Sequence, residues 1–224
     1  MTPDPGPFQV PDPPRAIPGE PHVDVIPVGT LLRRVHEEHD ADTFNPTAQP
    51  SRLRGGRFDS LDGSYAYTYL GYDDEGAIAE TVARDLPLDG SARLVPRVRI
   101  KGRRITTVEV MRSLAVLSLH GPWVAQVGAG LWLTKSDADQ YEQTRAWAAW
   151  LLETLSSVDG FAYRCRHDED RMALALFDDT PGGGTGRAAG ALRAHPDTEW
   201  IDRGEGLLEV ERILGRHNAA VEPH

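Results

Sequence analysis

RGGRFDSLDGSYAYTYLGYDDEGAIAE, residues 54–80, is the stretch that decides the fold of this chain. Within it, three tyrosines alternate with smaller residues: Tyr65, Tyr67 and Tyr69. A period of two is typical of a β-strand, in which successive side chains point to opposite faces. We therefore predict a strand over residues 64–72, with the three tyrosine rings on one face.

A helix is predicted directly after this strand. Asp73 or Asp74 can cap its first turn, and it would run from Glu75 to about Arg84. Its apolar stripe consists of Ala77, Ile78, Thr81 and Val82. Glu80 lies on the flank of this stripe. Glu80 could form a surface pair with Arg84, four residues later, or it could face a cleft.

Three residues of this segment together indicate a nucleotide site. Arg57 follows Gly55 and Gly56, and a guanidinium beside glycines is suited to hold phosphate oxygens. Tyr69 ends the strand, where its ring could cover a flat heterocycle. A carboxylate such as Glu80 stabilises the cation that forms when a glycosidic bond breaks. Each residue alone also fits a structural role, such as a solvated turn arginine or a half-buried sheet tyrosine.

The composition favours one soluble globular domain. The 224 residues are 40% hydrophobic and carry a net charge of −10. The acidic balance, with no evident basic stripe, argues against direct nucleic-acid binding. The single cysteine excludes an internal disulfide, and no apolar run reaches the ~20 residues of a membrane span. With no signal-peptide pattern at the N-terminus, we expect a cytoplasmic protein.

The chain divides into three regions in this prediction. Residues 1–22 are proline-rich and are expected to form a disordered or docked tail. Residues 23–214 form a single domain, and residues 215–224 form a C-terminal tail that frays.

Further elements are predicted along the domain. LLRRVH, residues 31–36, fits either a strand or a short helix. Short strands are expected over residues 92–134, in the runs RLVPRVRI, RRITTVEV, LAVLSLH and GLWL. A helix follows from about Ser136, and then come strands at 161–166 and 171–177. The last run is almost continuously apolar, so it should lie centrally in a sheet.

Two other motifs have both a structural and a chemical interpretation. His36 and His39 lie beside acidic residues, but without a further ligand set we expect no metal site there. Cys165 lies between Arg164 and Arg166, and positive charge would favour a reactive thiolate. No Cys-His-Asn or Cys-His-Asp order is evident, so a small half-buried strand residue is the other interpretation.

The order of four motifs resembles the RES-domain family, named for its arginine, glutamate and serine. These motifs are LLRRVH, GGRF, YTYLGYDDEGAIAET and GFAYRCRHDEDRMALALFDD, and they span about Leu31 to Asp178. The resemblance implies an α+β fold like that of the ADP-ribosyltransferases, with a central split β-sheet and flanking helices. Family members are typically NAD-consuming toxins. Their usual antitoxin carries an Xre-type helix-turn-helix domain that blocks the active site.

The resemblance also implies roles for individual residues. Arg34 and Arg57 look like the arginines that hold NAD+, which would be a substrate and not a cofactor. Tyr69 looks like the active-site tyrosine and Glu80 like the catalytic glutamate. At the position of the family's serine, this chain has Cys165. A thiol is a weaker hydrogen-bond donor than a hydroxyl, so this departure would weaken catalysis if the hydroxyl orients a reacting group.

The expected activity is cleavage of the nicotinamide–ribose bond of NAD+, with water or phosphate as the acceptor. One alternative is transfer of ADP-ribose to a macromolecule. Transferases of this fold often carry an acidic residue or glutamine two positions before the glutamate, where this chain has Ile78. The other alternative is an NAD-binding module weakened by Cys165. The expected partners are NAD+ and an Xre-type antitoxin, and the oligomeric state stays open.

Overall fold

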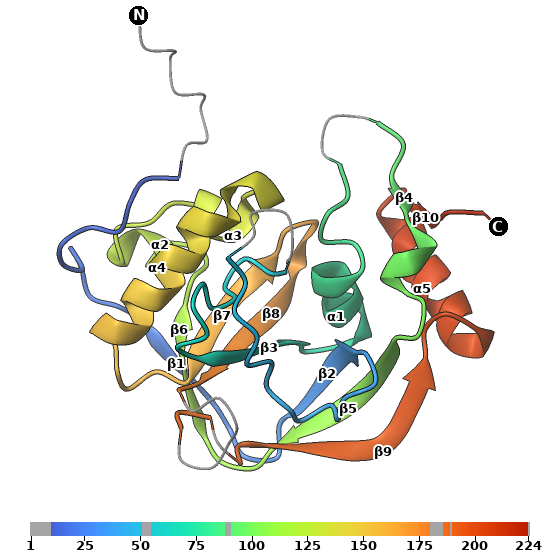
Figure 1. Cartoon of the computed structure of the whole chain (residues 1–224), viewed down its shortest axis with the longest axis horizontal. Helices are drawn as coiled ribbons and strands as arrows, with labels where there is room; N and C mark the ends of the chain where they lie inside the picture. Colours follow the sequence, from blue (N-terminus) through green and yellow to red (C-terminus); the bar gives the residue numbers. More distant parts are fainter. Residues whose placement is uncertain (1–9, 51–54, 88–90, 180–185, 189, 224) are drawn as a thin grey trace, which may run out of the picture.

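The computed structural model describes residues 10–50, 55–87, 91–179, 186–188 and 190–223. Its centre is an eight-stranded sheet with the order β1-β6-β7-β8-β3-β2-β5-β9 (Figure 1). The strands are β1 (Val23–Ile26), β2 (Leu31–His36), β3 (Ala66–Gly71), β5 (Arg104–Val110), β6 (Leu114–Ser118), β7 (Gly160–Cys165), β8 (Asp168–Asp178) and β9 (Leu192–Trp200). A second, parallel pair is formed by β4 (Leu94–Val95) and β10 (Ala220–Val221).

Five α-helices and two 3₁₀ helices are found in the described residues. They are α1 (Asp74–Thr81), η1 (Arg97–Arg99), α2 (Trp123–Gln126), α3 (Trp132–Lys135), η2 (Ala138–Gln140), α4 (Tyr141–Thr154) and α5 (Gly204–Arg216). In Figure 1, α2, α3 and α4 lie together over one half of the sheet, while α1 and α5 lie beside the other half. The fold is therefore the predicted α+β type, a large sheet flanked by helices.

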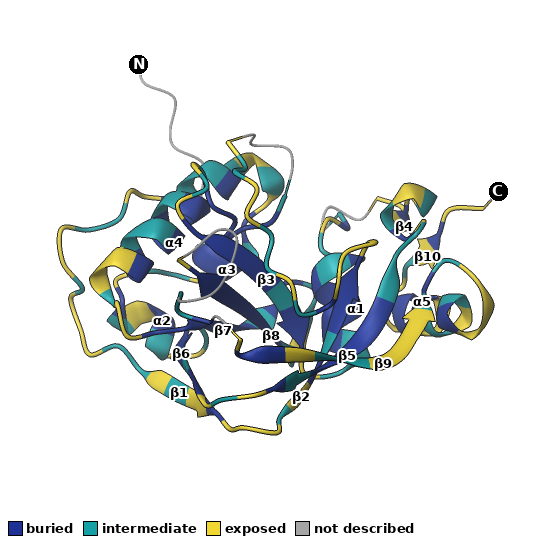
Figure 2. Cartoon of the chain, turned by 60° about the horizontal axis from the view of Figure 1, so that its bottom comes forward, coloured by how far each residue is buried: buried dark blue, intermediate teal, exposed yellow. Residues whose placement is uncertain are grey.

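Strand β8 forms the middle of the sheet, as its apolar sequence predicted. Ala175 and Phe177 point into the core under α4, while Leu174 and Leu176 point into the core of the opposite face. All four side chains are fully buried, which stabilises the fold by roughly 1.5–3 kcal/mol for each of the larger ones. Figure 2 shows the contrast between these buried central strands and the exposed edge strand β9.

Strand β3 confirms the prediction that the alternating tyrosines place their rings on one face of the sheet. Tyr65, Tyr67 and Tyr69 all pack on the side of the sheet that α4 covers, and Leu70 packs into the opposite core. The helix after it is confirmed as well, because the Asp73 carboxylate caps α1 and accepts a 2.7 Å bond from the Gly76 N–H.

The sheet is split between β2 and β3. The two strands share a single register pair, Arg33 with Gly71, whereas β2 pairs with β5 and β3 pairs with β8 at six positions each. Beyond that pair the strands diverge, and α1 begins where β3 ends. Gly71 permits this turn, since a Cβ there would lie 2.2 Å from the Ala77 nitrogen. The split places one face of α1 next to the gap between the strands.

The region 92–134 corrects two predicted strands. In RLVPRVRI only Leu94–Val95 is a strand, and Pro96 leads into the 3₁₀ helix η1. GLWL leads into the helix α3, in which Leu133 is buried, while Leu131 at the N-cap is 62% exposed. A strand would place these two leucines on the same face, so the apolar run was too short to show its period. LLRRVH, left open between strand and helix, forms β2.

Strand β9 was not predicted because its sequence, LRAHPDTEW, has little apolar character. It pairs only with β5 and is therefore an edge strand. Pro196 is tolerated there, since an edge strand leaves every second N–H group unpaired.

Both predicted tails contact the fold. Val10 is buried, and the Trp147 indole N–H donates a 2.6 Å bond to the Pro11 carbonyl, so the described part of the proline-rich segment is docked. Residues 1–9 lie outside the described residues. At the other end, the boundary predicted at residue 214 falls within α5, and β10 pairs with β4. The C-terminal residues up to Val221 therefore belong to the domain and do not form a frayed tail.

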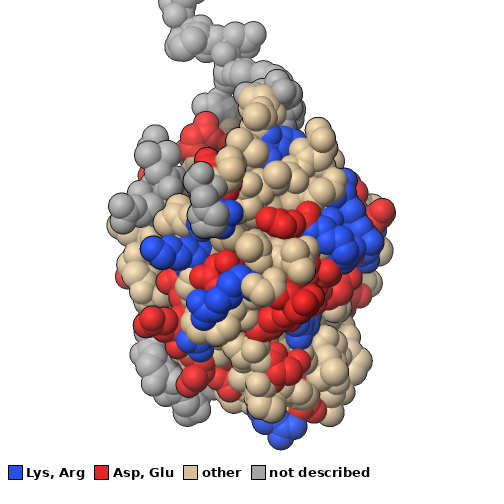
Figure 3. Space-filling view, turned by 90° about the vertical axis from the view of Figure 1, so that its right-hand side faces the viewer, with Lys and Arg blue, Asp and Glu red and all other residues tan. Residues whose placement is uncertain are grey.

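The face over α5 carries intermixed charges (Figure 3). Glu75 accepts ion pairs from Arg171, Arg212 and Arg216. Arg212 also pairs with Glu209 at 2.5 Å. Such exposed ion pairs each contribute little to the stability of the fold. Positive and negative charges offset each other on this surface. No helix in the described ranges is long and apolar enough to cross a bilayer.

Candidate functional site

A cleft of about 670 Å³ opens where the sheet splits. It is lined by residues of β2 and β3, by Glu80 of α1, by the segment from Gly55 to Asp59 and by the turn before β5. The lining includes Arg34, His36, His39, Gly56, Asp59, Tyr69, Glu80, Arg84, Arg99, Lys101 and Arg103. The cleft therefore brings Arg34, Tyr69 and Glu80 together.

Gly55 and Gly56, the two residues before Arg57, must be glycine for different structural reasons. Gly55 adopts a φ of +80°, which L side chains rarely adopt. Gly56 lies so close to β3 that a Cβ would approach the Tyr69 hydroxyl to 2.5 Å and the Asp59 carboxylate to 2.7 Å. The loop can therefore press against the strand only with glycine at both positions.

Tyrosine hydroxyls of β3 hold this loop. The Tyr69 hydroxyl donates a 2.7 Å bond to the Asp59 carboxylate and accepts a 2.9 Å bond from the Phe58 N–H. Burial and the neighbouring Asp59 raise the pKa of Tyr69 well above its usual value, so the hydroxyl stays protonated. The ring lines the cleft, while the hydroxyl is bonded to the loop.

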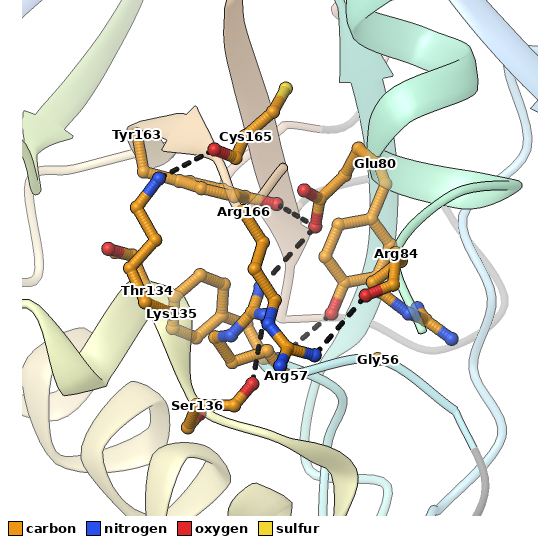
Figure 4. A network of polar contacts seen from close by, with 12 residues as sticks. Gly56, Arg57, Glu80, Arg84, Thr134, Lys135, Ser136, Tyr163, Cys165 and Arg166 are labelled. Atoms are coloured by element: carbon orange, nitrogen blue, oxygen red, sulfur yellow. Dashed lines mark hydrogen bonds and ion pairs between the residues drawn. The ribbon is translucent and has the colours of Figure 1, made fainter. Parts of the chain in front are cut away.

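Glu80 is buried and faces the cleft, so the surface pair with Arg84 is the wrong interpretation. Its side chain is 3% exposed. The Tyr163 hydroxyl donates a 2.9 Å bond to Oε1, and Figure 4 shows the two groups pointing toward each other. Oε2 has no hydrogen-bond partner among the described residues. A buried carboxylate oxygen without a donor is costly, and it is the kind of group that a ligand or a developing cation would satisfy.

Arg57 lies behind Glu80 and not on the cleft surface. Its fully buried guanidinium places Nη1 3.5 Å from Oε1 of Glu80, and Nη2 donates a 3.2 Å bond to the Ser136 carbonyl (Figure 4). The Tyr141 ring lies 5.5 Å from it, and burial alone would lower the pKa of Arg57, but Tyr141 and Glu80 raise it. Thr144 of α4 fixes the Arg57 carbonyl with a 2.7 Å bond. The arginine predicted to hold substrate contacts the Glu80 carboxylate.

Arg34 lines the cleft but is extensively bonded within the protein. Its Nη1 donates to the carbonyls of Ala41 and Thr43, at 2.7 and 2.5 Å, and Nη2 lies 3.5 Å from the His39 ring. Burial lowers its pKa to about 10, which still leaves it protonated near neutral pH. Arg34 thus organises the loop after β2 at the edge of the cleft.

Cys165 does not line the cleft. It is fully buried, its Sγ lies 3.6 Å from the Gly76 carbonyl, and its sulfur points away from Arg57 (Figure 4). Burial, followed by the charge of Glu80, raises the pKa of the Cys165 thiol well above its usual value. The reactive thiolate suggested by the flanking arginines is therefore a wrong interpretation, because the buried thiol stays protonated.

The two histidines of HEEHD are bonded to the protein. The His36 ring contacts the His39 carbonyl at 2.8 Å and the Thr106 hydroxyl at 2.9 Å, so both of its nitrogens are used. Within the described ranges, no cluster of three or more potential ligands for a metal ion is found.

Four cationic residues of the cleft were not predicted as site residues. Arg84 follows α1, and Arg99, Lys101 and Arg103 come from the segment RVRIKGRR, residues 97–104. Residues 93–100 and 103–110 were predicted as two separate strands with Lys101 in the break between them, so a shared cationic turn was not expected. It holds five of the 24 basic residues of the chain, and that density was the available signal.

The split sheet and the buried glutamate–arginine–tyrosine cluster define an α+β protein with a polar cleft at the split. The model of the RES domain matches residues 31–200, and the chain belongs to this family. Among solved structures, it is similar to a chain in the crystal structure of the M. tuberculosis MbcT–MbcA toxin–antitoxin complex. The identity is 18% and the TM-score 0.51, over 78% of this chain and 85% of that chain, which shows a shared fold. No curated protein matches the chain.

Proposed function

We propose that this protein is a cytosolic toxin that degrades NAD+ by cleaving the bond between nicotinamide and ribose. The observation that carries the proposal is the Glu80 carboxylate, which is buried at the cleft with one oxygen lacking a partner among the described residues. Membership of the RES family supports a reaction on NAD+.

Glu80 would act by electrostatic stabilisation. As the C1′–N1 bond breaks, its electron pair leaves with nicotinamide, and positive charge develops on the ribose ring. A carboxylate in a site of low polarity stabilises such a cation far better than water does. Water or inorganic phosphate then attacks C1′. Water gives ADP-ribose and a released proton, and phosphate gives an ADP-ribose phosphate ester.

The surrounding residues would keep the carboxylate in place. Tyr163 and Arg57 bind the same oxygen of Glu80, which leaves Oε2 for the reacting sugar. The Tyr69 ring, on the cleft surface, would pack against the nicotinamide ribose. Arg34 and Arg57 stay predicted substrate-holding residues, although their hydrogen bonds favour roles in shaping the site.

Two observations favour this reaction over the alternatives. Ile78, two residues before Glu80, is 1% exposed in the apolar core and offers no polar group to an acceptor side chain. Cys165 lies outside the cleft lining, so its replacement of the family's serine removes no hydroxyl from the cleft surface.

The proposed partner is an antitoxin protein. The similar solved structure is described as a toxin–antitoxin complex. An Xre-type antitoxin that covers the cleft would suppress NAD+ cleavage until it is removed.

The test is NAD+ consumption by the purified protein, with products separated in the presence and absence of phosphate. Glu80→Gln keeps the shape but removes the charge, and turnover should fall about 100-fold or more. Glu153→Gln, at an exposed position of α4, should keep wild-type turnover. Thermal unfolding of each variant shows whether it is folded. If a folded Glu80→Gln protein consumed NAD+ at the wild-type rate, the proposal would be refuted.

A further inference from the structure

The turn formed by residues 97–103, here called the basic turn, is firmly positioned beside the cleft. Ile100 anchors it in the apolar core and is 1% exposed. Gly102 adopts a φ of +70°, and its N–H donates a 2.7 Å bond to the Asp202 carboxylate. The turn therefore presents Lys101 and Arg103 to the cleft from a fixed backbone.

The cationic side chains of the cleft differ in how far they are already neutralised. Arg103 pairs with Glu37 at 3.1 Å, and Arg99 pairs with Asp85. The Lys101 side chain makes no ion pair or hydrogen bond with any described residue, and Lys101 is exposed.

Arg84 also keeps donors available toward the cleft. Its Nε forms a 3.3 Å ion pair with Asp85, and its guanidinium lies 5.9 Å from the centre of the Tyr141 ring. Neither Nη nitrogen bonds to a residue that the structure describes. Its side chain is 14% exposed and lines the cleft.

The arginines expected to bind phosphate have fewer donors left. Nη1 of Arg34 is shared between two backbone carbonyls, and Arg57 is fully buried outside the cleft lining. A bound dinucleotide would still need cations for the two negative charges of its diphosphate. Among the described residues of the cleft, Arg84 and Lys101 are the cations best able to supply them.

We infer that Arg84 and Lys101 form the anchor for the diphosphate of a dinucleotide bound in this cleft. The inference deepens the proposed function and rests on it for the position of the ribose. Arg84 follows Glu80 by four residues and lines the same cleft, so we place the 5′ side of a ribose bound at Glu80 next to Arg84. The diphosphate then extends from Arg84 toward Lys101. Glu37 and Glu38 also line the cleft.

The experiment measures binding of ADP-ribose to the full chain by calorimetry. ADP-ribose has the diphosphate but lacks the bond that is cleaved. Arg84→Gln and Lys101→Gln should each weaken binding by about 10-fold or more, because each removes a charge-assisted hydrogen bond. Arg97→Gln is the matched control, since it removes the same charge from the same turn but does not line the cleft. Adenosine, which has no phosphate, should bind the wild type and the variants alike.

The outcomes separate this inference from the proposed function. Equal binding of ADP-ribose by the wild type, Arg84→Gln and Lys101→Gln overturns the anchor, even if NAD+ is consumed. An equal loss in Arg97→Gln also overturns it, because the effect would then reflect net charge. An absence of ADP-ribose binding to the wild type also overturns the anchor. Selective loss in Arg84→Gln and Lys101→Gln, without NAD+ turnover by the wild type, supports the anchor and removes the proposed reaction. Lys101 is exposed, so its variant tests the anchor even if Arg84→Gln does not fold.

Discussion

Replacing Arg57 by methionine should strongly destabilise the protein. The guanidinium is fully buried, and its Nη1 lies 3.5 Å from the Glu80 carboxylate. At an effective dielectric constant of about 20, Coulomb's law gives an attraction of about 5 kcal/mol for this separation. Methionine fills similar space but leaves the Glu80 charge buried without its cation. We expect the free energy of unfolding to fall by about 3–5 kcal/mol.

Urea unfolding followed by tryptophan fluorescence would measure this loss. Arg193→Met is the matched control, because Arg193 pairs with Glu109 on the surface and is 58% exposed. Its effect should stay within about 0.5 kcal/mol. A loss below about 1 kcal/mol for Arg57→Met would refute the reasoning that the buried pair is strongly coupled.

A double-mutant cycle tests the same coupling directly. Arg57→Met combined with Glu80→Gln leaves neither buried charge. The double variant should therefore be more stable than the sum of the two single losses predicts, by about 1.5–3 kcal/mol. Simple additivity would show that the two charges do not stabilise each other in the fold.

Three further changes should have measurable effects. Tyr163→Phe removes the 2.9 Å bond to Glu80 and should lower the free energy of unfolding by about 1.5–3 kcal/mol, whereas unchanged urea unfolding would show that the bond contributes little. Gly56→Ala should lower the melting temperature, because its Cβ would lie 2.5 Å from a tyrosine hydroxyl, while Gly215→Ala, with open space around it, should not. Burial lowers the pKa of His167 to about 4, below its unfolded value of about 6.5. The folded state thus favours the neutral ring, and stability should fall by about 1–2 kcal/mol from pH 7 to pH 5. His167→Gln should flatten that part of the pH profile, and an unchanged profile would contradict the assignment.

Local patterns in the sequence were enough to predict the elements that form the centre of the site. The alternation of Tyr65, Tyr67 and Tyr69 predicted both the strand β3 and the shared face of the rings. Asp73 marked the start of α1, and the apolar run 171–177 marked a central strand. These features depend on neighbours within a few residues, and such information is present in the sequence itself.

The identity of the predicted cleft residues also followed from the sequence, but their contacts did not. Arg34, Tyr69 and Glu80 do line one cleft. The sequence did not show that Arg57 lies behind Glu80 or that the Tyr69 hydroxyl binds Asp59. Those contacts join segments that are far apart in the sequence or separated by a turn, so no local sequence pattern predicts them.

The tertiary structure alone decided where the sheet opens and which charges face the opening. A single register pair, Arg33 with Gly71, joins β2 to β3, and this is a property of long-range pairing. The same packing buries Glu80 and Cys165 and turns Lys101 toward the cleft. Burial sets the cost of a charge and the pKa of a thiol, and it depends on every element packed around a residue. The sequence by itself therefore determined β3, α1, β8 and the chemical groups near them, and the packing of distant elements determined what each group can do.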